Sequence, residues 1–362
     1  MRIEILCRGS SREGLGHLLR ARTFARYARR RHEVAIMAIV EPGLESVFED
    51  MAGDVTFARS DAELAGHIGR TSPDAICFDT VWIDPDVFAV ARARRCVTVS
   101  LSPVFDHMDQ VDILFTRSKR YPMLPGVSVF AGLQYAIFSE HCMVIGDAPY
   151  RANLSLQDLP IAVCMGGSDA ANKTLRVIRA LTAMPMRSTI WVLLGEGYAH
   201  SYNSLVEQVR GSTTHEVILA KTNRSMWRIM NQCAVAVLAG GLTTIESVYA
   251  GLPSINLFER QEHVDAMATD LFDAGVCLNG GLFSEESLLT LVTEMDALDR
   301  NRDRLWEMHT RSHGILDRHG SERVLREIEN ACVAKKSWVV RAAEMRHRPV
   351  GVDAAVMPVP AA

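Results

Sequence analysis

The stretch Ala234–Pro253, AVAVLAGGLTTIESVYAGLP, contains the features that decide the fold. Its first part, Ala234–Leu238, is a short apolar run of the kind that forms a parallel strand buried on both faces. Two glycines follow this run, and a helix is predicted to begin at Leu242 or Thr243. The closing Gly-Leu-Pro is a typical signal for the end of a helix. The stretch therefore predicts a buried strand, a glycine turn and a helix, which together are one repeat of an α/β architecture.

The same alternation recurs along the chain. Apolar runs are separated by longer segments with helical spacing, as in Leu175, Ile178, Leu181 and Met184, which fall on one helical face. The runs predicted to be strands are Ile3–Cys7, Glu33–Val40, Ala75–Phe78, Cys96–Ser100, Ile113–Thr116, Ile161–Met165, Thr189–Leu194, Val217–Ala220, Ala234–Leu238, Ser254–Phe258 and Val276–Leu278. Repeated alternation of this kind indicates parallel sheets with right-handed crossovers.

The length and the spacing of the runs predict the domain organisation. A chain of 362 residues is long enough for about two domains. The alternation is interrupted between Arg117 and Leu159, where prolines and glycines gather, and restarts near residue 160. We therefore expect two Rossmann-like, doubly wound domains, 1–150 and 151–330, that face each other across a cleft, and a terminal helix with a frayed tail over 331–362. Ligands of such sheets bind at the carboxyl ends of the strands.

Composition excludes several classes of protein. With 39 Lys+Arg against 43 Asp+Glu, the net charge is −4, and the basic excess typical of nucleic-acid binding is absent. The N-terminal apolar stretch Ile3–Cys7 is interrupted by Glu4 and is too short for a signal peptide, and no segment reaches the length of a membrane span. The eight cysteines form no C-x-x-C pair and are expected to be buried in a reducing, cytoplasmic protein. Five basic residues and Trp338 lie between Lys335 and Arg348; we interpret them as a solvated helix face, with peripheral membrane contact as the alternative.

The first chemical motif is Gly14-Leu15-Gly16-His17, just after the first predicted strand. Glycines let a ligand approach the backbone and a helix N-terminus attracts anions, so Gly14 and Gly16 are candidate sugar- or phosphate-binding residues. The dinucleotide fingerprint G-x-G-x-x-G fails because residue 19 is Leu, and no cofactor is expected. His17 can point into the cleft as a general base. A structural histidine that caps the helix is the equal alternative.

The second motif is Gly166-Gly167-Ser168-Asp169, which precedes a helix predicted over Lys173–Met184. Two consecutive glycines directly after a buried strand favour a backbone turn that faces a phosphate or a ribose. The alternative is that Ser168 or Asp169 caps the helix.

The third motif is the most specific, and its candidate nucleotide-binding residues are Gly240, Gly241, Leu242, Thr243, Thr244 and Glu246. Free backbone N–H groups and two threonine hydroxyls lie at the positive end of the helix, where they can hold a diphosphate without a metal. Glu246 lies on the same face as Thr243, and its carboxylate can accept both hydroxyls of a ribose. The alternative is a capping box between Thr243 and Glu246, which leaves the two glycines unexplained.

The fourth motif is Glu259-Arg260-Gln261, at the end of the predicted strand Ser254–Phe258. Glu259 and Gln261 can bond sugar hydroxyls and Arg260 can meet a phosphate, with a solvated loop as the equal alternative.

Two acidic groups look like metal sites, but neither is predicted to be one. Asp84-Pro85-Asp86 is interpreted as a helix start. Asp106-His107-Met108-Asp109 is interpreted as part of a loop, because it has no matching ligands nearby.

Taken together, these motifs resemble the GT-B group of nucleotide-sugar enzymes. The resemblance is carried by GLGHLLRARTFARYAR at 14–29, GGSDAANKTLRVIRAL at 166–181, MWRIMNQCAVAVLAGGLTTIESVYAGLP at 226–253 and HVDAMATDLFDAG at 263–275. Within the group, the chain is most similar to the UDP-sugar hydrolases of the pseudaminic-acid pathway, and next to the peptidoglycan N-acetylglucosaminyltransferases. The resemblance covers most of residues 1–280 and is weakest over 40–130, where acceptor recognition usually lies.

The resemblance implies a UDP-type nucleotide held by the C-terminal domain. Glu246 would bind the ribose, the Gly241–Thr244 turn would bind the diphosphate, and His17 would act as the base from the N-terminal, acceptor-side domain. Two departures disfavour hydrolysis. The hydrolases commonly have an Asn-Gln pair where this chain has Arg260-Gln261, and a tyrosine after the strand that here continues as Asp79-Thr80-Val81-Trp82.

The sequence therefore predicts a metal-independent glycosyltransferase that moves a sugar from a nucleotide diphosphate donor, with UDP favoured, to an unidentified acceptor hydroxyl. A UDP-sugar hydrolase is the first alternative. A non-catalytic nucleotide-sugar-binding protein is the second. All three functions are compatible with the same fold, so the expected fold does not decide between them.

Overall fold

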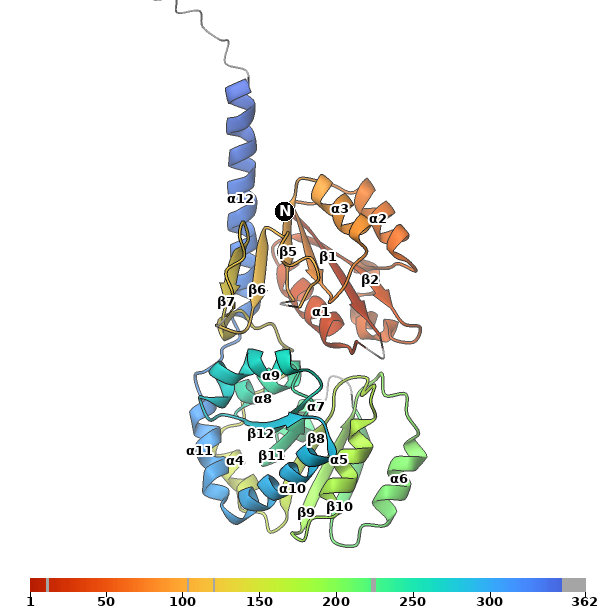
Figure 1. The fold of residues 1–362 in the computed structure, drawn as a ribbon, viewed down its shortest axis with the longest axis vertical. Coiled ribbons are helices and arrows are strands. Elements are labelled where there is room, and N and C mark those ends of the chain that lie inside the picture. The colour runs from red at the N-terminus through yellow and green to blue at the C-terminus, as the bar shows by residue number, and fades with distance from the viewer. Residues whose placement is uncertain (11–12, 103, 120, 223–225, 347–362) are drawn as a thin grey trace, which may run out of the picture.

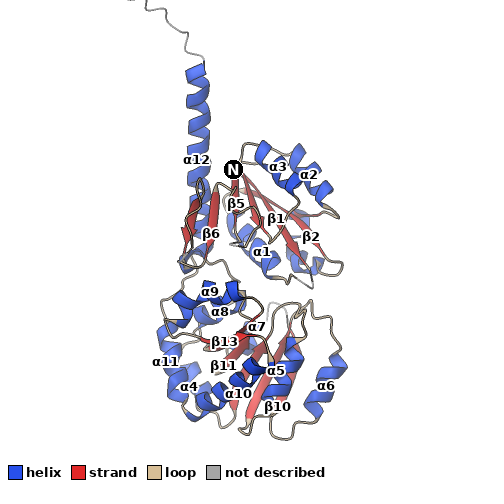
Figure 2. Ribbon diagram, in the orientation of Figure 1, coloured by secondary structure: helices blue, strands red, loops and turns tan. Residues whose placement is uncertain are grey.

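The computed structural model describes residues 1–10, 13–102, 104–119, 121–222 and 226–346. The chain forms two units, each built on a parallel β-sheet, which lie one above the other in Figure 1. In both units helices cover the sheet, as the colouring in Figure 2 makes clear. The predicted α/β architecture is confirmed.

The first sheet has seven strands in the order β3-β2-β1-β4-β5-β6-β7. Its strands are β1 (Arg2–Gly9), β2 (Glu33–Val40), β3 (Val55–Phe57), β4 (Ala75–Asp79), β5 (Val97–Ser100), β6 (Ile113–Thr116) and β7 (Ser128–Ala131). The helices of this part of the chain are α1 (Gly16–Ala28), η1 (Glu45–Asp54), α2 (Asp61–Arg70), α3 (Pro85–Ala93) and η2 (Leu133–Tyr135).

The second sheet has six strands in the order β10-β9-β8-β11-β12-β13. Its strands are β8 (Leu159–Cys164), β9 (Ser188–Leu194), β10 (Glu216–Lys221), β11 (Val235–Leu238), β12 (Ser254–Phe258) and β13 (Leu278–Leu282). The remaining helices are α4 (Asp147–Leu154), α5 (Lys173–Leu181), α6 (Tyr202–Arg210), α7 (Met226–Met230), α8 (Leu242–Ala250), α9 (Gln261–Met267), η3 (Ala268–Phe272), α10 (Glu285–Arg300), α11 (Arg302–Ser312) and α12 (Gly320–Arg346).

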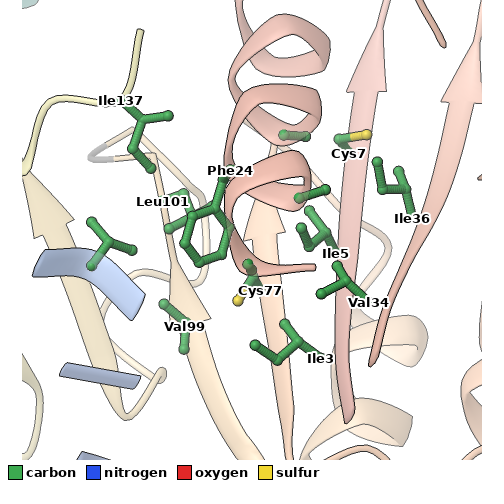
Figure 3. Close-up of a cluster of buried hydrophobic side chains, with 14 of the residues drawn as sticks. Ile3, Ile5, Cys7, Phe24, Val34, Ile36, Cys77, Val99, Leu101 and Ile137 are labelled. Atoms are coloured by element: carbon green, nitrogen blue, oxygen red, sulfur yellow. The ribbon is translucent and has the colours of Figure 1, made fainter. Parts of the chain in front are cut away.

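The central strands are buried on both faces, which explains their continuous apolar runs. On β1, Ile3 and Ile5 pack with Phe24 of α1 (Figure 3), whereas Leu6 packs on the opposite face with residues of α2 and α3. All eight cysteines of the chain are buried, as expected. None of the described helices combines the length and the apolar character that crossing a membrane requires.

Helix α12 returns from the second unit to the first. Just before it, Arg318 bonds the hydroxyl of Tyr249 on α8. Further along, Val324, Leu325 and Ile328 join the core formed by β1 and α1. The expected domain limits group residues 320–330 with the second domain, but the structure packs this segment on the first sheet. The predicted frayed tail lies outside the described residues, as do the side chains of the expected basic helix face from 336 onward.

The differences from the predicted strands lie at the sheet edges. β3 and β7 are not predicted, and β7 falls in the stretch interpreted as an interruption. The last strand is β13, Leu278–Leu282, rather than Val276–Leu278. These three strands are all terminal in their sheets. Each of the three has a neighbour on only one side and lacks the apolar run on which the prediction relied, whereas the fourth edge strand, β10, has such a run and is predicted.

Gly195→Ala is expected to destabilise the second unit. A Cβ at Gly195 would lie 2.3 Å from the backbone oxygen of Gly167, and a backbone atom cannot move aside as a side chain can. We expect a cost of about 1–3 kcal/mol in the free energy of unfolding, measured by urea denaturation. Gly211→Ala is the control, because the nearest atom to its Cβ is 3.8 Å away. Equal stability of the two variants would contradict this packing.

Candidate active site

A cavity of about 770 Å³ lies between the two units and is lined by both. Its walls follow the carboxyl ends of central strands, where ligands of doubly wound sheets bind. From the first unit come the turn at Gly14–Arg20 and residues after β5 and β6. From the second unit come the turns after β8 and β11, together with Glu259 after β12. The volume is suitable for a small-molecule ligand.

His17 lies in the first turn of α1 and forms part of the cavity wall. It does not cap the helix, because the N-cap position is Leu15 and has no side-chain capping bond. Its Nδ1 is 2.7 Å from Oδ1 of Asp79 at the end of β4. An ionised carboxylate only accepts hydrogen bonds, so Nδ1 carries the proton and Nε2 keeps the lone pair that a general base needs.

Asp79 is completely buried and is paired with two residues of α1. Burial raises its pKa, but the charge of Arg20 and the hydrogen bond from His17 outweigh burial, and the net pKa lies below its usual value. Arg20 Nε donates to Oδ2 at 2.8 Å, and a second bond runs from Arg20 Nη2 to Oδ1. Asp79 is therefore ionised at neutral pH and orients the imidazole of His17.

Asp79 and Arg20 are not among the residues predicted from the sequence to form the site. Asp79 is separated from His17 by 62 positions in the sequence. The sequence contains one clue to Asp79, namely an acidic residue at the end of a buried strand. This clue points to the site only once the pairing of β4 with β1 is known, because that pairing brings Asp79 close to the turn that follows β1.

Arg117 is a second functional candidate that sequence reasoning missed. It follows β6, is half-buried and lines the cavity. Burial, with a contribution from nearby Arg20, lowers its pKa to about 9, although Asp79 acts in the opposite direction. Its guanidinium has no hydrogen bond or ion pair with any residue in the described part of the chain. Arg117 is thus a cation at the cavity that forms no ion pair with any of the described residues.

The turn after β8 both caps the following helix and faces the cavity, which are the two alternatives that the sequence leaves open. The carboxylate of Asp169 accepts the backbone N–H groups of Lys173 and Thr174 at 2.8 and 2.9 Å, so Asp169 caps α5. Gly166, Gly167 and Ser168 line the cavity, and Asp169 itself also borders it. Gly166 has a φ of +98°, which favours glycine. Because Gly166, Gly167 and Ser168 form part of the cavity wall, a ligand in the cavity can contact them.

The two glycines after β11 are there for different reasons. Gly240 has a φ of +66°, and a Cβ at this position would lie 2.2 Å from the ring of Phe258. Packing and backbone conformation therefore require a glycine at 240. A Cβ at Gly241 would meet nothing within 4 Å. Since Gly241 lines the cavity, the space beside it is available to a ligand.

Helix α8 begins at Leu242, one of the two predicted starts, with Gly241 as its N-cap. Leu242 and Thr243 line the cavity. Thr244 does not, because its Oγ1 donates to Oδ1 of buried Asn256 at 2.6 Å. The alternative capping box is absent, since no side chain caps α8.

Glu246 is a buried carboxylate on the cavity wall. The backbone N–H of Ser139 donates to its Oε1 at 3.0 Å. Burial raises the pKa of Glu246 to about 7, against smaller lowering effects of Ser139 and of the indole N–H of Trp227. The indole N–H of Trp227 forms no hydrogen bond of normal geometry with the described residues, so it acts on the carboxylate only as a nearby dipole. At neutral pH this carboxyl group is therefore poised between its two protonation states.

The fourth motif is divided by the structure. Glu259 lines the cavity and pairs with Nζ of Lys173 at 2.7 Å. Arg260 and Gln261 are exposed and do not line it. Gln261 begins α9 and donates to Asp265 one turn further on. The structure agrees with both interpretations of the acidic groups. Asp84 caps α3, so the first group is a helix start. The second group, which contains His107, lies in a loop.

Comparison with known proteins gives distant relatives. No family model matches the chain. It is 21% identical over 275 residues to the uncharacterised protein MJ1062 of Methanocaldococcus jannaschii, covering 72% of this chain and 56% of that protein. It is 26% identical over 164 residues to the spore coat polysaccharide biosynthesis protein SpsG of Bacillus subtilis, covering 45% and 48%. The chain thus spans about half the length of these curated relatives.

Solved structures identify the fold. MurG of Acinetobacter baumannii matches with a TM-score of 0.63 at 13% identity, over 91% of this chain and 99% of MurG. UGT89C1 of Arabidopsis thaliana, solved in complex with UDP, matches with a TM-score of 0.59 at 11% identity, over 90% and 99%. At these identities the likeness concerns the fold alone. The chain has the GT-B fold, with two parallel-sheet units that meet at a shared cavity.

Proposed function

We propose that the chain is a metal-independent glycosyltransferase that takes a sugar from a UDP donor and passes it to an acceptor hydroxyl. The observation that carries this proposal is the pairing of His17 with Asp79 in the same cavity as the open turn at Gly241. One wall thus offers a base, and the other offers free backbone donors at the start of α8. The GT-B fold and the relationship to a polysaccharide biosynthesis protein support a sugar nucleotide as the ligand.

In the proposed reaction, Nε2 of His17 takes the proton of the acceptor hydroxyl. The acceptor oxygen forms a bond to the anomeric carbon of the donor sugar as the bond from that carbon to the diphosphate oxygen breaks. The electron pair of the broken bond leaves with UDP. The buried carboxylate of Asp79 stabilises the imidazolium that forms at His17.

The leaving diphosphate needs positive charge, and the chain provides it from both walls. The N-terminus of α8 at Gly241 and Leu242 presents unpaired N–H groups and the positive end of the helix dipole. Arg117 adds a guanidinium that forms no hydrogen bond or ion pair with any of the described residues. Both are positioned before the reaction, and preorganised charge is an effective way to stabilise a transition state.

Glu246 is proposed to bind the ribose of the nucleotide. Its carboxylate is on the cavity wall close to the same turn, with one oxygen held by Ser139. A ribose has two neighbouring hydroxyls, which donate to a carboxylate. Thr244 has no part in the proposal, because its hydroxyl is used by Asn256. Arg260 and Gln261 have none either, since they lie outside the cavity wall.

The hydrolase alternative differs only in the nucleophile, because water would replace the acceptor hydroxyl. No particular contact in the cavity favours it. UDP release from a panel of UDP-sugars, measured with and without a mixture of saccharide acceptors, separates the two reactions. Release that depends on acceptors supports the transferase, and equal release in water alone overturns it.

His17→Asn and Asp79→Asn are expected to reduce kcat by about 100- to 10,000-fold, because the first removes the base and the second removes the group that orients it. The Kd for UDP should change less than about 3-fold, since neither residue binds the nucleotide in this account. UDP release and calorimetric titration measure these two quantities.

His32→Asn is the matched control for these variants. His32 pairs with Glu329 at the same 2.7 Å but lies outside the cavity wall. Normal turnover by His17→Asn, or an equal loss in His32→Asn, would contradict the assignment of the base.

Gly241→Ala is expected to weaken UDP binding without loss of stability, whereas Gly240→Ala is expected to lower stability. The methyl group at 241 fills only cavity space, so the variant should fold normally and bind UDP at least ~10-fold more weakly. The methyl group at 240 strikes Phe258, so that variant should lose thermal stability. Unfolding curves and UDP titrations measure both effects. Unchanged UDP affinity in Gly241→Ala would show that no diphosphate lies there.

UDP binding is expected to release protons through Glu246. The pKa of this group is about 7 in the free protein, and hydroxyl donors from a ribose favour the ionised form and lower that pKa. At pH 7 roughly half a proton should leave per UDP bound, and affinity should rise from pH 6 to pH 8.

Titration calorimetry in two buffers of different ionisation enthalpy measures this release. Glu246→Gln removes the titrating group while the phosphates of UDP stay the same, so any proton change from the ligand cancels in the comparison. Identical proton release in wild type and Glu246→Gln would contradict the proposed ribose contact.

A further inference from the structure

A cluster outside the cavity joins two helices of the second unit. It consists of Asp147, the first residue of α4, and of His309 and His313 at the end of α11. One potential ligand atom from each of them lies within 4.8 Å of the other two. Both helices lie on the outer side of the lower unit in Figure 1. None of these three residues lines the cavity.

The hydrogen bonding of His309 fixes its tautomer. Its Nδ1 is 2.5 Å from the backbone oxygen of Gly251, and a carbonyl only accepts, so Nδ1 carries the proton. In the neutral ring, Nε2 then presents a lone pair. The side chain of His309 has no exposed surface, and Nε2 has no hydrogen-bond partner among the described residues. A buried, unpartnered acceptor is costly unless something satisfies it.

The group that faces this lone pair is another acceptor. Oδ1 of Asp147 is 3.5 Å from Nε2 of His309 and 3.8 Å from Nδ1 of His313. Two lone pairs that point at each other need a cation between them. A proton on His309 is a poor candidate, because a charged imidazolium would be completely buried and 3.5 Å is too long for a hydrogen bond to a carboxylate.

We propose that Asp147, His309 and His313 bind a divalent cation of the zinc class. Histidines at positions i and i+4 of a helix lie on the same face and are a common pair of zinc ligands. In a tetrahedral zinc site the ligand atoms are roughly 3.3 Å apart. The two separations from Asp147 need to shrink by only a few tenths of an ångström, and the two imidazole nitrogens, which lie within 4.8 Å of each other, need to approach by about 1.5 Å at most. Two imidazole ligands disfavour Mg²⁺ and Ca²⁺, which prefer oxygen.

The surroundings match those of a metal site. The Nδ1–H bond from His309 to Gly251 is the kind of outer contact that orients a ligating imidazole. His309 is stacked on Tyr150 with ring centres 4.0 Å apart, which holds the ring in place. Asp147 and His313 are 61% and 39% exposed, so the cation has a route in and water can complete its coordination.

The cation would stabilise the second unit rather than take part in the reaction. It would link α4 to α11, and His309 bonds Gly251, the residue that ends α8. Because α8 provides the proposed nucleotide-binding turn, zinc would hold the far end of this helix in place. The inference does not depend on the proposed function, since it uses no residue of the cavity.

The test is titration of the EDTA-treated full chain with ZnCl₂, together with visible spectra recorded with CoCl₂. We expect one Zn²⁺ per chain, a rise in the unfolding temperature with Zn²⁺, and the intense d–d bands of tetrahedral Co²⁺. His313→Asn and Asp147→Asn change exposed side chains, so both variants should fold. Each should bind Zn²⁺ at least ~10-fold more weakly and lose the Co²⁺ bands.

His319→Asn is the matched control, because His319 forms another exposed histidine–carboxylate pair, with Glu322 at 3.0 Å. It should bind Zn²⁺ as the wild type does. The proposal is overturned if the wild type has no site with a Kd below ~100 μM. It is also overturned if both cluster variants bind like the wild type, or if His319→Asn loses binding equally.

Discussion

The buried carboxylate of Asp79 is the group on which the candidate active site depends. An ion without solvent is costly, and Asp79 stays ionised because Arg20 and His17 lie against it. The same contacts fix the imidazole, so that one nitrogen is committed to Asp79 and the other remains available. Removal of Arg20 would leave the buried carboxylate without its counter-charge, and removal of His17 would take away one of its hydrogen-bond donors. Catalytic geometry and stability of the first unit are thus linked through one side chain.

The second requirement is that the two units stay close enough to share a cavity. A packing contact, an ion pair and the last helix of the chain hold the two units together. Leu15 packs directly on Gly167, so close that a Cβ there would lie 2.9 Å from its side chain. Lys119 forms an ion pair with Asp270 at 3.2 Å, which joins the loop after β6 to η3. Helix α12 adds its apolar face to the first core after leaving the second unit. The base and the α8 turn therefore line one cavity.

The sequence was informative where the physical signal is local. Buried central strands have continuous apolar runs, and a glycine turn between a strand and a helix is visible in adjacent residues. Gly14, His17 and Gly241 were predicted in this way, and all line the cavity. The edge strands β3, β7 and β13 gave little signal because they lack the same burial.

The residues that were missed depend on the tertiary fold. Asp79 and Arg117 acquire their meaning only when β4 and β6 end beside the turn at His17, and no spacing rule indicates that. Thr244 shows the opposite limit. It sits in a glycine motif and is predicted to bind the nucleotide, but its hydroxyl is engaged by Asn256. A motif identifies the turn, and only the structure separates the residues that support it from those that face the cavity.

The central claim is that the cavity holds a uridine-type nucleotide through Glu246. It is tested most directly by a thermal-shift panel of UDP, dTDP, GDP, ADP and NAD without metal, on the wild type and on Glu246→Ala. A ligand at 100 times its Kd stabilises a protein by about 2.7 kcal/mol, which is several degrees for a chain of this size. The account predicts a shift with UDP that Glu246→Ala loses, and a smaller shift with dTDP, whose deoxyribose lacks the 2′-hydroxyl. No shift with any nucleotide, or a shift with NAD alone, would contradict it.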